Sequence, residues 1–214
     1  MTMRHHITPR PAALLCLSSA AVLLLASCEG ATDTTDDTLP ELEFVALVGE
    51  PERPLPIIGA IPATYDGVPV LWQTLDFSLG AIDPSANLSR YDGTVSLYLG
   101  GHLPGQDFRE NYGRLRIEAE LPAGPVPGPA KVIEIAVIDV PGYDVPRYVG
   151  GADAKLEMTA ISPPTDEFSV FGQISGNFSA TLCRAESQTA TPDRADCKTI
   201  EGTFETEASF ESLR

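Results

Sequence analysis

The feature of this chain that most restricts its fold is the strict alternation of charged and apolar residues in RLRIEAEL, residues 114–121. An apolar residue at every second position is the pattern of a half-buried β-strand. Similar runs lie at residues 42–48, 70–79, 94–99 and 155–161. No segment shows an apolar period of 3.6 residues over eleven or more positions, so the chain is predicted to be all-β.

Glycine and proline separate these runs. The sequence holds 18 Gly and 19 Pro, and the tripeptide Tyr-Asp-Gly occurs at 65–67 and at 91–93. Asp-Gly accepts the positive φ of tight hairpin turns, which explains the repeat more simply than a recognition motif does. Residues 131–140 are almost continuously apolar and predict a strand covered on both faces. These features favour an antiparallel β-sandwich or a partly open barrel.

Residues 170–210 predict a C-terminal hairpin, with a register that follows if Cys183 lies opposite Cys197. Two glycines would then lie under aromatic rings of the opposite strand, with Phe178 facing Gly202 and Phe204 facing Gly176. This register also separates an apolar face, whose only polar members are Thr206 and Lys198, from a polar face interrupted only by Phe171. A slip of one residue would destroy both features.

The first 27 residues carry Arg4 and Arg10, no acidic residue, and an uncharged apolar stretch, which is the layout of a signal peptide. The apolar stretch is shorter than the roughly 20 residues of a membrane-spanning helix, so a permanent span is the weaker alternative. Residues 28–40 are mostly Thr, Asp and Gly and predict a tether, although their acids can also bind a cation or direct surface export. Residues 41–214 then form a single β-sandwich domain.

The tetrapeptide Leu-Ala-Ser-Cys at 25–28 resembles the lipobox of bacterial lipoproteins. The resemblance implies that Cys28 receives diacylglycerol on its sulfur, becomes the first residue after cleavage, and is acylated, for instance with palmitate, on its new amine. Several acyl chains anchor a protein firmly. Glu29, in place of the aspartate that often signals inner-membrane retention, implies the outer membrane of a bacterial cell envelope.

Two cysteines, Cys183 and Cys197, remain once Cys16 is removed with the leader and Cys28 is lipidated. An isolated pair in an exported protein predicts a structural disulfide at the base of the hairpin loop. Glycine and phenylalanine motifs around this hairpin, SGNFSAT and IEGTFE, resemble uncharacterised envelope lipoproteins of the DUF6252 type. That resemblance implies a β-sandwich and no specific activity.

Charge excludes one class of partner. Removal of residues 1–27 takes away two arginines and no acid, which changes the formal net charge from −16 to −18. A nucleic-acid-binding protein needs a basic face, so nucleic acid is not expected as a partner.

Residues 100–113 form the best candidate ligand loop, because polar and charged groups gather there between two predicted strands. Its members are His102, Asp107, Arg109, Glu110 and Tyr112. The same loop is also explained as a solvated connection.

His102 is the only histidine after residue 27, which excludes multi-histidine metal centres and HExxH sites, and no cofactor motif is present. Trp72, among apolar neighbours, predicts a core residue and not a sugar-stacking platform.

We therefore expect a non-enzymatic binding or scaffolding module, held to the membrane by lipidated Cys28, with an envelope protein or a glycan as its partner. No catalytic or metal-binding residues are assigned, and no cofactor. The alternative is a hydrolase or carbohydrate-binding or carbohydrate-processing protein with its site in the 100–113 loop. Calcium-assisted binding through converging Asp and Glu oxygens is a third expectation.

Overall fold

The computed structural model of the protein describes residues 55–77, 85–106, 112–140, 142, 144–166, 169–210 and 213, all within the compact unit Glu50–Arg214. The segments predicted as signal peptide (1–27) and tether (28–40), and the strand expected at 42–48, lie outside the described residues. The structure contains ten strands: β1 (Ile57–Tyr65), β2 (Val68–Leu75), β3 (Ala86–Tyr91), β4 (Thr94–Gly101), β5 (Arg114–Leu121), β6 (Gly128–Ile138), β7 (Arg147–Gly150), β8 (Lys155–Ser162), β9 (Phe171–Ala185) and β10 (Asp193–Ser209). The predicted all-β class is confirmed. Within the described ranges, no helix is long and apolar enough to cross a membrane.

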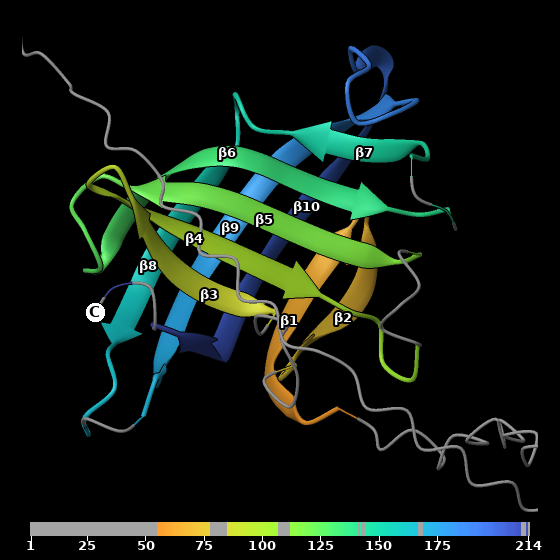
Figure 1. Cartoon of the computed structure of the whole chain (residues 1–214). Helices are drawn as coiled ribbons and strands as arrows, with labels where there is room; N and C mark the ends of the chain where they lie inside the picture. Colours follow the sequence, from red (N-terminus) through yellow and green to blue (C-terminus); the bar gives the residue numbers. More distant parts are fainter. Residues whose placement is uncertain are drawn as a thin grey trace, which may run out of the picture. The chain divides into compact units, whose positions relative to one another are not determined.

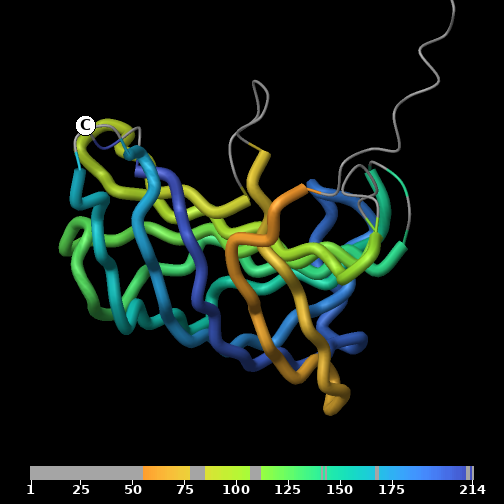
Figure 2. Tube along the Cα trace, turned by 90° about the horizontal axis from the view of Figure 1, so that it is seen from below, coloured from red at the N-terminus to blue at the C-terminus, as the bar shows by residue number. Residues whose placement is uncertain are grey.

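The ten strands form one sheet that folds over into two layers (Figure 1). The front layer contains β3, β4, β5, β6 and β7, and the back layer runs β2–β1–β10–β9–β8 (Figures 1 and 2). Nearly all pairings are antiparallel; the exception is a single parallel bridge between Ser209 of β10 and Asn87 of β3. The layers are also joined by short pairings of β7 with β9 and of β6 with β8. The predicted sandwich is confirmed as one continuous mixed sheet, not a regular barrel.

The hydrophobic core lies between the two layers. The alternation in β5 buries Leu115, Ile117, Ala119 and Leu121 and turns the charged residues outward, as the sequence predicts. Trp72 is 2% exposed and lies in this core, where its Nε1 donates a hydrogen bond to the carbonyl oxygen of Gly113 at 2.6 Å.

The C-terminal hairpin has the predicted register. Cys197 pairs with Cys183, Gly202 with Phe178 and Phe204 with Gly176, and the register continues to Ser209. A disulfide joins the two cysteines. The predicted apolar face is buried in the core: Ile174, Phe178, Leu182, Ile200, Phe204, Ala208 and Phe210 are each at most 3% exposed.

Two tight turns confirm the interpretation of the Tyr-Asp-Gly repeats. Asp66 and Gly67 have φ values of 50° and 78°, and Asp92 and Gly93 have 48° and 80°. Both pairs of residues have positive φ, the signature of a type I′ hairpin turn. The turns connect β1 to β2 and β3 to β4.

Strand β6 departs from the prediction of a strand covered on both faces. Only its last four residues, 135–138, are buried on both sides; its first part alternates, and Ile133 is 51% exposed. The outer face of β6 is therefore buried only at its end, where it pairs with β7, and Ile133 points to solvent while Val132 packs against the core. Sequence patterns also did not predict β1, β3 or the short strand β7.

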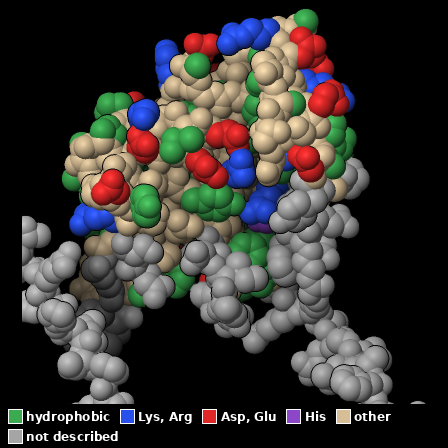
Figure 3. All heavy atoms as spheres, turned by 45° about the horizontal axis from the view of Figure 1, so that its top comes forward, with side chains coloured by type: hydrophobic (Ala, Val, Ile, Leu, Met, Phe, Trp, Pro, Cys, Tyr) green, Lys and Arg blue, Asp and Glu red, His purple; other side chains and the backbone are tan. Residues whose placement is uncertain are grey.

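Charged side chains of both signs are mixed on the face drawn in Figure 3. On the front layer Arg116 pairs with Glu134, and Lys131 Nζ lies 2.8 Å from Glu120.

Candidate functional site

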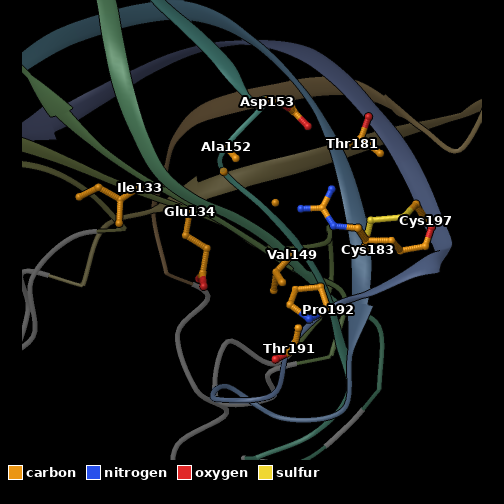
Figure 4. Close-up of a pocket in the computed structure, with 13 residues that line it drawn as sticks. Ile133, Glu134, Val149, Ala152, Asp153, Thr181, Cys183, Thr191, Pro192 and Cys197 are labelled. Atoms are coloured by element: carbon orange, nitrogen blue, oxygen red, sulfur yellow. Dashed lines mark hydrogen bonds between the residues drawn. A yellow bond between two sulfur atoms is a disulfide. The ribbon is translucent and has the colours of Figure 1, made fainter.

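A concave pocket of about 460 Å³ lies beside the Cys183–Cys197 disulfide (Figure 4). We call it the disulfide pocket. Strands β6, β7, β9 and β10, together with the segments that follow β7 and precede β10, contribute its lining: Ile133, Glu134, Val149, Gly150, Gly151, Ala152, Asp153, Thr181, Cys183, Thr191, Pro192, Arg194 and Cys197.

Two adjacent glycines give this pocket its shape. A Cβ atom on Gly150 would lie 2.3 Å from the carbonyl oxygen of Thr181, and one on Gly151 would lie 2.6 Å from that of Ile133. Real Cβ atoms do not approach backbone oxygen so closely, and only glycine lets the chain pass there. The end of β7 can therefore lie tightly against β9 and β6, and the chain then turns away at residues 151–154.

The disulfide forms one wall of the pocket. Val149 pairs with Cys183 across β7 and β9, and Cys183 pairs with Cys197 across β9 and β10. In Figure 4 the disulfide and Thr181 lie at one side and Ile133 and Glu134 at the opposite side. Because these walls are hydrogen-bonded strands closed by a covalent bond, the pocket is largely pre-formed.

The lining combines apolar surface with a few charges. Ile133, Val149, Ala152, Pro192 and the disulfide are the apolar part. The carboxylate of Glu134 is bound by the Arg116 guanidinium, through hydrogen bonds that include one of 3.0 Å from Nε. Arg194 and Asp153 have no ion-pair partner in the described part of the chain. Such a mixture suits a ligand with an apolar body and a small number of polar groups.

Of the residues named in the predicted ligand loop, the structure describes His102 and Tyr112. His102 follows the end of β4 and forms an isolated bridge to Gln73, with backbone hydrogen bonds of 2.8 and 2.9 Å. Its side chain is 4% exposed and lies edge-on to the ring of Phe77, with 5.8 Å between centroids. Tyr112 is 45% exposed. Asp107, Arg109 and Glu110 lie outside the described residues.

Burial, and in second place the positive charge of Arg114, lowers the pKa of His102 to about 4. The imidazole is therefore neutral at physiological pH, and its Nε2 is buried without a hydrogen-bond partner. A side chain so deeply covered cannot reach a substrate in solution.

A second polar cluster closes one end of the core. Lys198 Nζ lies 3.9 Å from the ring centroid of Tyr148 and 5.2 Å from that of Tyr65, and 3.6 Å from Oδ2 of Asp139. The Tyr148 hydroxyl donates to Asp196 at 3.0 Å. Burial of Tyr65, followed by nearby negative charge, raises the pKa of its phenol. Cation–π contacts and an ion pair account for the inward position of Lys198, which the hairpin register predicts.

Sequence reasoning missed the disulfide pocket. Its chemical groups come from separate segments, and none forms a motif. The available signals were the doublet Gly150-Gly151 and the predicted disulfide, and neither indicates a cavity unless the pairing of β7 with β9 is known.

Within the described ranges, no three or more His, Cys, Asp or Glu side chains are placed to hold a metal ion. Comparison with protein-family models, curated proteins and solved structures finds no match to this chain.

Proposed function

We propose that the protein is a bacterial envelope lipoprotein, anchored in the outer membrane through lipidated Cys28, whose β-sandwich binds a ligand or partner segment in the disulfide pocket. The observation that carries the binding role is the pocket itself. Its volume of about 460 Å³ lies within the range of roughly 300–1,000 Å³ that is usual for small-molecule sites. Its walls are pre-formed, which lowers the entropy cost of binding.

The position of His102 favours binding over a hydrolase in the 100–113 loop. A general base must come within hydrogen-bond reach of the proton that it abstracts. His102 is 4% exposed and held by its backbone bridge to Gln73, so its imidazole lies away from solvent. The disulfide pocket, in contrast, combines accessible surface with apolar and charged groups.

The anchor is tested by substitution of the lipobox cysteine. In a bacterial host, we expect the full-length chain in the membrane fraction, with a lipid-modified Cys28 as its first residue in mass spectrometry. Cys28→Ser should retain its leader and carry no lipid. Cys16→Ser is the matched control, because it also removes a cysteine from the N-terminal region and should leave processing unchanged. An unmodified, full-length N-terminus on the wild-type protein would exclude the anchor.

Binding in the pocket is tested with a photo-crosslinking amino acid at Ile133. Leu71 of β2 is the control position, because its exposure of 45% is close to the 51% of Ile133 and it does not line the pocket. In intact cells, we expect a discrete adduct from position 133, detected by mass spectrometry, and none from position 71. The adduct should disappear when Ala152→Trp fills the pocket. Identical products from both positions, or an adduct that survives Ala152→Trp, would contradict the pocket as the binding site.

A further inference from the structure

The disulfide pocket contains a cation, Arg194, that no described residue neutralises. Four other cations form ion pairs: Arg116 with Glu134, Lys131 with Glu120, Arg184 with Glu186 and Lys198 with Asp139. Arg194 lines the pocket and has no ion-pair partner among the residues that the structure describes. Its guanidinium stays charged at any physiological pH and offers a planar set of donors that matches a carboxylate.

A second, independent observation comes from Arg147 of β7. This side chain is 2% exposed, yet its Nε and Nη2 have no hydrogen-bond partner in the described structure. A buried guanidinium without a counter-charge is strongly unfavourable. The acids of the neighbouring segments are used elsewhere: Asp139 by Lys198, Asp144 by the backbone N–H of Gln188, and Glu134 by Arg116.

Arg147 lies close enough to influence the pocket. It precedes Val149 by two residues in the same strand, and the pairing of Arg147 with Ala185 is separated from that of Val149 with Cys183 by the pair Tyr148–Arg184. Residues two apart in a strand point to the same face and lie about 7 Å apart. Arg147 is therefore the next residue on the same strand face as Val149, which lines the pocket.

Within the described residues, neither carboxylate of the pocket forms an ion pair with Arg147 or Arg194. Glu134 is neutralised by Arg116. Asp153 is exposed, in the segment between β7 and β8. Interactions of exposed charges are screened by water and salt, whereas those of a buried charge such as Arg147 are screened much less. Arg194 is exposed as well, so its charge is screened like that of Asp153, and Arg147 supplies the buried positive charge near the Val149 side of the pocket.

We propose that the ligand of the disulfide pocket is a small carboxylic acid with an apolar body, whose carboxylate binds Arg194 and whose body lies on Ile133 and Val149. This inference rests on the proposed function, because it assigns a chemical class to the ligand of the same pocket. Arg147 is a positioning residue that favours the anion through its field, without being one of the pocket's lining residues.

Matched ligands test the charge preference. The full-length lipidated protein in nanodiscs is titrated by calorimetry with isocaproate and benzoate, with the corresponding amides, and with isohexylamine, with empty nanodiscs as the blank. We expect saturable binding of at least one carboxylate, at least tenfold tighter than that of its amide. Arg194→Gln should reduce carboxylate affinity about tenfold and leave amide affinity unchanged. Arg90→Gln removes an exposed cation on β3 and should change neither.

Substitutions of Arg147 should change carboxylate affinity and melting temperature in opposite directions, which a purely structural role would not predict. Arg147→Met should weaken carboxylate binding severalfold and, without ligand, raise the melting temperature, because it removes an uncompensated buried charge. Arg147→Lys keeps the charge and should retain the preference for carboxylates. A Met variant with unchanged carboxylate affinity overturns the assigned role of Arg147.

The remaining outcomes separate the two proposals. If an amide or the amine binds as tightly as the carboxylates, or if no carboxylate binds at millimolar concentration while the crosslink at position 133 persists, the anion assignment is wrong and the binding function stands. If neither carboxylates nor any crosslinked partner occupies the pocket, the proposed binding function itself is wrong.

Discussion

At the scale of single residues, His102 makes the fold sensitive to acid. Its pKa is about 4 in the folded protein against an ordinary value of 6.5, so between these values the unfolded chain binds more protons than the folded one. Stability from this residue is therefore complete above about pH 7 and falls as the pH drops from 6.5 to 4. One pKa unit corresponds to about 1.4 kcal/mol, so the loss is on the order of 3 kcal/mol at most.

Urea denaturation of the wild type and of His102→Gln at pH 7.5 and pH 4.5 measures this effect. Carboxylates titrate in both proteins, so the difference between the two proteins isolates the histidine. We expect the free energy of unfolding to fall more steeply with acid in the wild type than in the variant. Parallel pH dependences would show that His102 is solvated in the folded state.

At the scale of elements, the β9–β10 hairpin depends on glycines beneath aromatic rings. A Cβ on Gly202 would lie 2.7 Å from Cβ of Ala63 and 2.9 Å from Cζ of Phe178. Gly202→Ala should therefore destabilise the protein by about 1–3 kcal/mol, the usual cost of overpacking. Thr203→Ala, one residue along on the outer face, is the control and should cost under about 1 kcal/mol. Equal midpoints in urea for the two variants would contradict the packing role of Gly202.

The hairpin could be predicted from the sequence because its register is overdetermined. The cysteine pair, the two Gly–Phe pairs and the separation of polar from apolar faces all require the same alignment, and the structure has it from Cys197 to Ser209. Strand β7 carries no such signal: it has four residues and ends at Gly150, which Gly151 follows. Burial of the outer face of β6 likewise depends on which segments pack against it, and the local periodicity of the sequence does not encode this packing.

The candidate site could not be predicted for the same reason. Sequence composition directs attention to the 100–113 loop, where polar groups are contiguous. In the structure, His102 is withdrawn from solvent by a bridge to Gln73, a partner 29 positions earlier in the chain. The disulfide pocket instead gathers residues between Ile133 and Cys197 through the pairings of β7 with β6 and β9. Pairing between residues far apart in the sequence decides both the burial of His102 and the formation of the disulfide pocket.

At the scale of the whole molecule, the disulfide supports one end of the sandwich, where few backbone pairings hold the layers together. Strand β7 forms only three residue pairs with β9 and three with β6. Cys183 and Cys197 are 14 positions apart, and closing a loop of this size stabilises a protein by about 3 kcal/mol on the chain-entropy model. Cys183→Ser/Cys197→Ser should therefore lower the melting temperature by roughly 6–12 °C.

The effect on dynamics should be local. Because β4 and β5 pair over seven residues and bury the centre of the core, their amides should keep slow hydrogen exchange in the double variant. Amides of β7 and of the loop between β9 and β10 should exchange faster, since the sulfur link no longer holds the wall of the pocket. The measurement is hydrogen exchange by mass spectrometry on oxidised wild type and on the variant. A uniform acceleration across all strands would instead mean that the disulfide stabilises the sandwich globally, and that the pocket wall has no independent mobility.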